Sequence, residues 1–112
     1  MESTRQKKIS RLLQRELSEI FMKEAKALTL GTMVSVSKVR VSPDLGLARA
    51  YVSIFPSNKK DEVFAEIDKQ TSGVRRHLGM RVGKQLRIVP NLQFFVDDSL
   101  DYIDNIDRLL ND

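Results

Sequence analysis

Apolar residues recur every three or four positions in the first part of the chain, which predicts an amphipathic helix. One side of an α-helix repeats at this interval, so these side chains are expected to face the core. Ser3 or Thr4 can cap the start of the helix, and Gly31 marks the exit from the segment. The recurring positions are Ile9, Leu12, Leu13, Leu17, Ile20 and Phe21.

The next two segments are rich in β-branched residues and predict an antiparallel pair of strands. The valines of Met33–Val41 change phase midway, which indicates a bulge near Ser37–Lys38 or a strand buried on both faces. Residues 42–46 read SPDLG, a turn sequence in which glycine is expected to take the costly dihedral angle. The second strand places four apolar residues on one face, namely Ala48, Ala50, Val52 and Ile54.

The second half of the chain predicts an interrupted helix, a third strand and a last helix. Asn58 and Asp61 resemble a capping pair before a helical stripe that Gly73 interrupts. A strand is expected near residues 86–96, with Pro90 at an edge or bulge, and Ser99 is expected to cap the final helix. The order α-β-β-α-kink-α-β-α predicts a single α+β domain over residues 1–112, with the helices on one face of a three-stranded sheet.

Composition excludes several classes of protein. The chain has 112 residues and no cysteine, so it can form neither a disulfide framework nor a thiolate zinc site. No apolar run is long enough to span a membrane, and the start of the chain lacks the apolar stretch of a secretory signal. We therefore expect a cytoplasmic protein.

Charge is distributed unevenly along the chain. Residues 1–96 hold 18 basic and 9 acidic groups, whereas residues 97–112 hold one basic and six acidic groups. A basic body suggests a polyanionic partner, although ordinary solubility explains the net charge of +4 equally well.

The residues that could carry catalysis are few. His77 is the only histidine, and we interpret it as a surface or half-buried helix residue. Magnesium could bind the last carboxylate cluster, but helix-dipole stabilisation and a solvated face explain these acids better. We expect no enzyme activity, no metal and no cofactor. The cluster comprises Asp97, Asp98, Asp101, Asp104 and Asp107.

Basic residues form two groups that favour nucleic acid over a merely solvated surface. Four-residue steps place Lys7, Arg11 and Arg15 in one stripe on the first helix. The second group surrounds the glycine interruption, where guanidinium groups and free helix amides could both bind phosphate. Its members are Arg75, Arg76, Arg81, Lys84 and Arg87.

Two aromatic residues allow another interpretation of the second strand. Tyr51 and Phe55 share a face with Arg49 and could form a stacking platform for bases, as in RNA-recognition-motif domains. Those domains begin with a strand, whereas a long helix comes first here. We therefore interpret both aromatic residues as part of the core.

Three stretches together resemble the ribosome-binding factor A family of bacterial small-subunit maturation factors. They read ISRLL at 9–13, VRVSPDL at 39–45 and LRIVPNLQF at 86–94. The resemblance covers roughly residues 5–110 and implies a type II KH-like domain without a Gly-x-x-Gly loop. The family has an interrupted helix with an Ala-x-Gly signature, where this chain reads Thr71-Ser72-Gly73, so threonine replaces alanine.

The resemblance implies a non-catalytic ribosome assembly factor, which is the most specific functional expectation that these residues support. Such a factor binds free small ribosomal subunits, assists late maturation of the rRNA including its 5′ end, matters most in the cold, and could work with maturation GTPases. We expect a monomer. The predicted RNA-binding residues are Thr71, Ser72, Gly73, Arg75, Arg76, Arg81 and Lys84, with Lys7, Arg11 and Arg15 as secondary candidates. The alternatives are a general KH-like RNA-binding regulator and a protein–protein adaptor on the ribosome.

Overall fold

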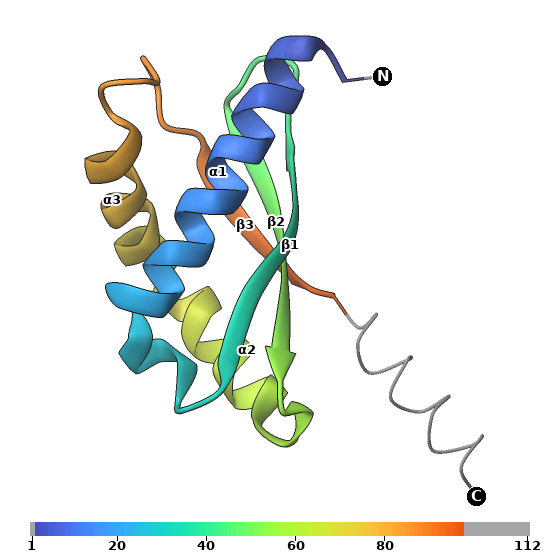
Figure 1. Cartoon of the computed structure of the whole chain (residues 1–112), viewed down its shortest axis with the longest axis vertical. Coiled ribbons are helices and arrows are strands. Elements are labelled where there is room, and N and C mark those ends of the chain that lie inside the picture. The colour runs from blue at the N-terminus through green and yellow to red at the C-terminus, as the bar shows by residue number, and fades with distance from the viewer. Residues whose placement is uncertain (1, 98–112) are drawn as a thin grey trace, which may run out of the picture.

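The computed structural model describes residues 2–97 as three helices packed against a three-stranded sheet (Figure 1). The predicted last helix and its Ser99 cap lie outside the described residues. Short 3-10 turns cover Lys26–Thr29 and Ser57–Lys59. The principal elements are α1 (Thr4–Lys23), β1 (Met33–Val41), β2 (Leu47–Phe55), α2 (Lys60–Lys69), α3 (Thr71–Val82) and β3 (Asn91–Val96).

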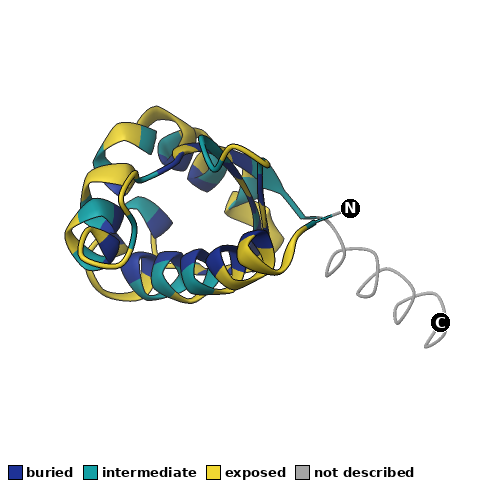
Figure 2. Cartoon of the chain, turned by 90° about the horizontal axis from the view of Figure 1, so that it is seen from above, coloured by how far each residue is buried: buried dark blue, intermediate teal, exposed yellow. Residues whose placement is uncertain are grey.

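The sheet has the order β1-β2-β3 and is mixed. β1 and β2 are antiparallel, as predicted, whereas β2 and β3 are parallel because α2 and α3 form the crossover between them. The predicted bulge is confirmed, since the register shifts between Val36 and Lys38. All three helices cover one face of the sheet, which confirms the α+β prediction, and the other face is left open (Figure 2).

The α1 helix follows its predicted pattern closely. Ser3 is the cap, and its hydroxyl accepts a hydrogen bond from the Gln6 amide while the Gln6 side chain accepts one from the Ser3 amide. The Gln14 amide group donates to the carbonyl oxygens of Val36 and Ser37, at 3.2 and 3.1 Å. The bulge breaks the strand ladder here, so α1 itself supplies the partner that these carbonyls would otherwise lack.

One hydrophobic core lies between α1, α2, α3 and the covered face of the sheet. Phe21 of α1 meets Phe94 of β3 edge to face, with ring centroids 5.9 Å apart. The branched residues of α2 and α3 close the core from the other side, and they are Val63, Ile67, Val74, Leu78 and Val82.

Three local predictions are wrong. Asn58 does not cap α2, because residues 57–59 form a 3-10 turn and the helix begins one residue later than Asn58 would require, after Lys59. In the 42–46 turn it is Leu45, with a φ of 62°, that takes the left-handed conformation in place of Gly46. The third strand is shorter than expected, since residues 86–90 form an irregular loop before β3.

Candidate nucleic-acid interface

The helical interruption lies at Gln70, three residues before the predicted position at Gly73. The Gln70 amide donates to the carbonyls of Glu66 and Ile67 and so ends α2, while the Gln70 carbonyl accepts from the Val74 amide and begins α3. Gly73 therefore lies in the first turn of α3, with ordinary helical hydrogen bonding around it. The prediction that glycine makes the break is wrong.

Threonine at position 71 supports the end of α2. Its hydroxyl donates to the Asp68 carbonyl at 2.8 Å and to the Ile67 carbonyl at 3.3 Å. The last carbonyls of a helix have no partner within the helix, so a side-chain donor at this point stabilises the break. Alanine at this position would have no such donor.

The first turn of α3 is open to an anion. No side chain caps it, and no acidic residue lies within it. Gly73 has a negative φ, and a Cβ added there would meet only the Gln70 Oε1 atom, at an ordinary 3.8 Å. Neither backbone strain nor packing within the described chain requires glycine here. The missing side chain instead leaves the turn accessible, and helix amino termini attract phosphate through their free amides and dipole.

Two arginines follow this turn and differ in their surroundings. The Arg75 guanidinium donates from Nε to the Pro90 carbonyl at 3.0 Å and from Nη2 to the Val89 carbonyl at 2.7 Å, so it anchors the loop before β3. Three of its five N–H donors are left for another partner. Arg76 is exposed, and no carboxylate pairs with it in the part of the chain that the structure describes.

Arg81 pairs through its guanidinium with three carboxylates, those of Glu16 and Glu19 in α1 and of Glu24, the residue that caps the end of α1. Its guanidinium nitrogens lie 2.9 Å from Glu16, 2.6 Å from Glu19 and 2.8 Å from Glu24, and only 19% of its side chain is exposed. Hydrogen bonds from Arg81 hold the pKa of Glu19 and of Glu24 below the ordinary value. Although these carboxyl groups are partly exposed to solvent, together they neutralise Arg81 and make it a connection between α1 and α3.

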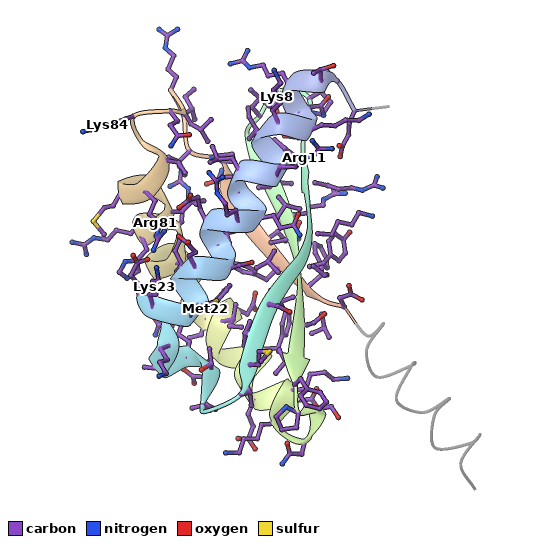
Figure 3. All side chains as sticks on the ribbon, viewed as in Figure 1. Lys8, Arg11, Met22, Lys23, Arg81 and Lys84 are labelled. Carbon is purple, nitrogen blue, oxygen red and sulfur yellow. The ribbon has the colours of Figure 1, made fainter. Side chains whose placement is uncertain are left out.

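Lys84 lies just beyond α3 and points away from the helices, whereas Arg81 lies on the side of α3 that faces α1 (Figure 3). The α1 stripe is also exposed along its length. Its last member, Arg15, lies 3.4 Å from a carboxylate oxygen of Glu16, and the other oxygen of Glu16 binds Arg81 of α3. Lys7 shares a groove with Lys38 and Arg40 of β1. The stripe therefore extends from a groove at β1 to the carboxylates that hold Arg81.

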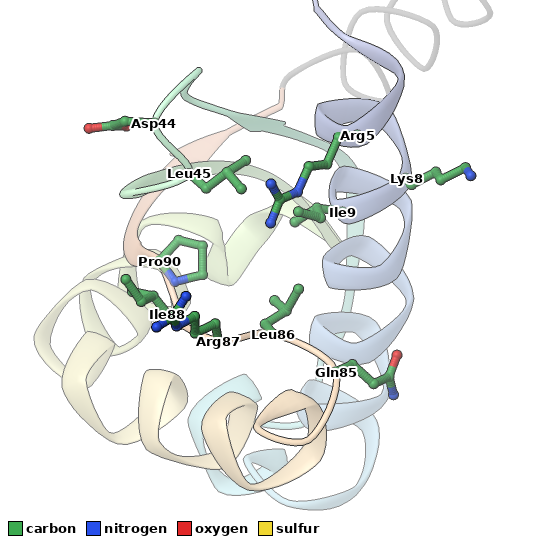
Figure 4. Close-up of a pocket in the computed structure, with 10 residues that line it drawn as sticks. All are labelled: Arg5, Lys8, Ile9, Asp44, Leu45, Gln85, Leu86, Arg87, Ile88 and Pro90. Carbon is green, nitrogen blue, oxygen red and sulfur yellow. The ribbon is translucent and has the colours of Figure 1, made fainter.

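A cleft of about 460 Å³ lies between the start of α1, the 42–46 turn and the loop before β3. The Arg5 side chain points into it, while Lys8 and Asp44 point away from it (Figure 4). Arg87 also lines the cleft. The sequence gives no signal that Arg5 belongs to a site, because Arg5 lies off the four-residue stripe. Only tertiary packing places Arg5 and Arg87 in the same cleft.

Tyr51 and Phe55 stand on the open face of the sheet, so their assignment to the core is wrong. Phe55 is 56% exposed. Strand residues alternate between faces, and the core face of β2 is already taken by its alanines, Val52 and Ile54. His77 is half-buried on α3, which confirms its interpretation as a helix residue. No helix among residues 2–97 is long and apolar enough to cross a membrane.

A three-stranded mixed sheet covered on one face by helices, with basic side chains after a broken helix, defines a KH-like domain. The chain belongs to the ribosome-binding factor A family, whose sequence model matches residues 5–110. Ribosome-binding factor A of Christiangramia forsetii is 47% identical to it over 108 residues, which are 96% of this chain and 82% of that protein. The Cytophaga hutchinsonii factor is 40% identical over 111 residues, which are 99% of this chain and 84% of that protein.

Solved structures agree with this fold. The crystal structure of ribosome-binding factor A from Thermus thermophilus superposes with a TM-score of 0.66 and 21% identity, covering 81% of this chain and 94% of that one. A homology model of the Thermus factor, fitted into a cryo-EM map of its 30S complex, superposes with a TM-score of 0.63 at 21% identity. This match covers 80% of this chain and 91% of that one. The family consists of non-catalytic ribosome assembly factors, which confirms the prediction that this chain is not an enzyme.

Proposed function

We propose that this protein binds the free small ribosomal subunit in the cytoplasm and assists late maturation of its rRNA, including the 5′ end. The open first turn of α3 carries the proposal. Glycine stands there although nothing within the described chain requires it, and two arginines follow within one helical turn. A phosphate of folded rRNA fits such a site because free amides and guanidinium forks both bind phosphate oxygens.

The contact surface comprises the α3 start and the cations that remain available after folding. Arg76 and Lys84 are exposed, and Arg75 keeps free donors while it anchors the loop. Thr71 holds the break in place, and the amides of Ser72 and Gly73 belong to the turn that receives the phosphate. Lys7, Arg11 and Arg15 make secondary contacts. Arg81 is left out because its charge is already neutralised by carboxylates.

Binding of this kind involves no covalent step. A-form RNA hides its base edges in a deep groove, so a compact basic domain recognises the backbone and the shape of paired regions. The protein would hold immature rRNA helices in a productive arrangement while nucleases trim the ends. A maturation GTPase would be a partner at release, and the factor would act as a monomer.

The test is cosedimentation of the Arg76→Glu variant with purified small subunits. We expect at least a tenfold weaker association, because the substitution replaces a phosphate-binding charge with a repulsive one. Lys59→Glu is the matched control, since it makes the same change of net charge at an exposed residue of the 3-10 turn before α2. If the two variants associate equally well with the subunit, the interface does not lie at α3.

Cosedimentation with joined ribosomes and binding to naked rRNA separate the alternatives. An assembly factor is found on free small subunits and is missing from joined ribosomes, whereas a general regulator of this fold binds RNA without that distinction. A protein–protein adaptor would show no affinity for naked rRNA, and its subunit association would be insensitive to Arg76.

A further inference from the structure

The open face of the sheet carries a row of side chains that the α3 site does not use. The Tyr51 ring of β2 stacks on the Phe95 ring of β3, with centroids 5.3 Å apart and planes at 24°. On the other side of Tyr51, the Lys38 ammonium lies 5.8 Å from the ring centroid. The row therefore runs across all three strands, and among the described residues no aromatic ring covers the outer side of Phe95.

Two arginines lie next to this row. Arg40 of β1 is the register partner of Arg49 of β2, and both side chains are exposed. Like charges directly opposite on neighbouring strands destabilise a sheet. Within residues 2–97 no carboxylate forms an ion pair with either arginine, and Glu2 is the acidic residue that lines a groove with both.

The basic surface continues around the edge of the sheet. A groove of about 350 Å³ connects Arg40 and Lys38 with Lys7 of the α1 stripe, and Glu2 also lines it. Among residues 2–97, Asp97 is the other carboxylate near this face, and it accepts a hydrogen bond from the Ser37 hydroxyl at 2.6 Å. Within residues 2–97, the four cations Lys7, Lys38, Arg40 and Arg49 therefore outnumber these two acids.

We propose that this surface, comprising Lys38, Arg40, Arg49, Tyr51 and Phe95, binds unpaired nucleotides of RNA. A base stacks on the outer side of Phe95 and extends the aromatic row, while the arginine pair neutralises neighbouring phosphates. Base stacking on aromatic side chains and a cationic surface for the backbone together form the common recognition mode for single strands. The inference rests on the proposed RNA-binding function, but it concerns the face of the sheet opposite the helices.

The chain itself offers a direct reporter. It contains no tryptophan, so Phe95→Trp introduces a single one at the stacking position and keeps a flat aromatic ring. We expect its fluorescence to be quenched by a single-stranded RNA octamer and to change little with the same octamer in a duplex. Phe64→Trp is the control, because Phe64 packs from α2 against the core and should not respond.

The arginine pair is tested by Arg40→Gln combined with Arg49→Gln. We expect about tenfold weaker octamer binding and a logarithmic salt slope shallower by about 1.4, since each phosphate contact of a single strand contributes about 0.7. The melting temperature should rise, because the opposed charges are removed. Lost affinity with a lowered melting temperature would indicate damage to the sheet and would overturn the proposal.

The remaining outcomes are distinguishable. An unquenched Phe95→Trp overturns the inference, and if Arg76→Glu still weakens subunit association the proposed function survives. Quenching without any subunit association would overturn the proposed function alone. If RNA has no effect but Asp98→Asn with Asp101→Asn and Asp104→Asn alters the tryptophan signal, the occupant is the chain's own acidic segment, which also overturns the inference.

Discussion

Glycine has a different role at each of two positions, Gly73 in the first turn of α3 and Gly83 just after its end. A Cβ at Gly83 would lie 2.7 Å from the Gly79 carbonyl oxygen, so packing within the chain requires glycine there. At Gly73 a Cβ has room, and glycine costs helix stability relative to alanine. A residue that the fold does not require and that lowers its stability points to an external partner.

Gly73→Ala should therefore stabilise the fold and weaken its function. We expect the free energy of unfolding to rise by about 0.5–1 kcal/mol, since alanine restricts the unfolded chain and favours helix. Subunit association should weaken because the new methyl group stands at the first turn of α3. Thermal melts and cosedimentation measure the two effects. Gly83→Ala is the contrasting variant and should lower the melting temperature.

Thr71→Val tests the hydroxyl that ends α2. The substitution keeps the side-chain shape but removes the donor to Asp68 and Ile67, so we expect a loss of about 0.5–1.5 kcal/mol in a denaturant titration. Thr71→Ser retains the hydroxyl and should lose less. If the valine variant is as stable as the unaltered protein, water donates hydrogen bonds to these two carbonyl oxygens as effectively as the hydroxyl does.

At the scale of the elements, α1 and α3 are joined by one arginine. Arg81 forms its ion pairs with residues 57 to 65 positions earlier in the chain. The carboxylates Glu16, Glu19 and Glu24 would repel one another without it. This connection holds the last turn of α3 against α1, at the end of the helix opposite the proposed phosphate site.

The pH dependence of stability should reveal this connection. The pKa values of Glu19 and Glu24 are lowered in the folded state, so their stabilisation is present above the ordinary value of about 4.5 and is lost as the pH falls through the folded values. Arg81→Ala should lower the melting temperature at pH 7. Its difference from the unaltered protein should shrink below about pH 4.5. A difference independent of pH would mean that packing, and not charge, is responsible.

At the scale of the whole molecule, the basic surfaces predict a strong dependence of binding on salt. If the α3 site and the α1 stripe neutralise about four phosphates of paired rRNA, the logarithm of affinity should fall with the logarithm of salt at a slope of about −3 to −4. Titrations of subunit association at several potassium concentrations measure this slope. Affinity that is indifferent to ionic strength would contradict a phosphate-based interface.

The basic surfaces also face in different directions. The α3 start lies on the helical side of the molecule, whereas the exposed Arg40–Arg49 pair lies on the open side of the sheet. A molecule with two such surfaces can bind a paired region with one and an unpaired linker with the other. This arrangement suits a factor that holds rRNA segments in a relative position before they reach their final structure.

Local patterns in the sequence determined much of this fold. The spacing of Leu13 and Leu17 predicts the buried side of α1, and the valine phase change predicts the bulge at Ser37, because both signals reside in neighbouring residues. The resemblance identified the family and the interrupted helix. What tertiary structure decided depends on partners distant in the chain. Sequence spacing cannot show that Arg81 is neutralised by α1, that Arg40 stands opposite Arg49, or that Phe95 stacks on Tyr51 across parallel strands, since each contact forms only when the sheet and helices pack together.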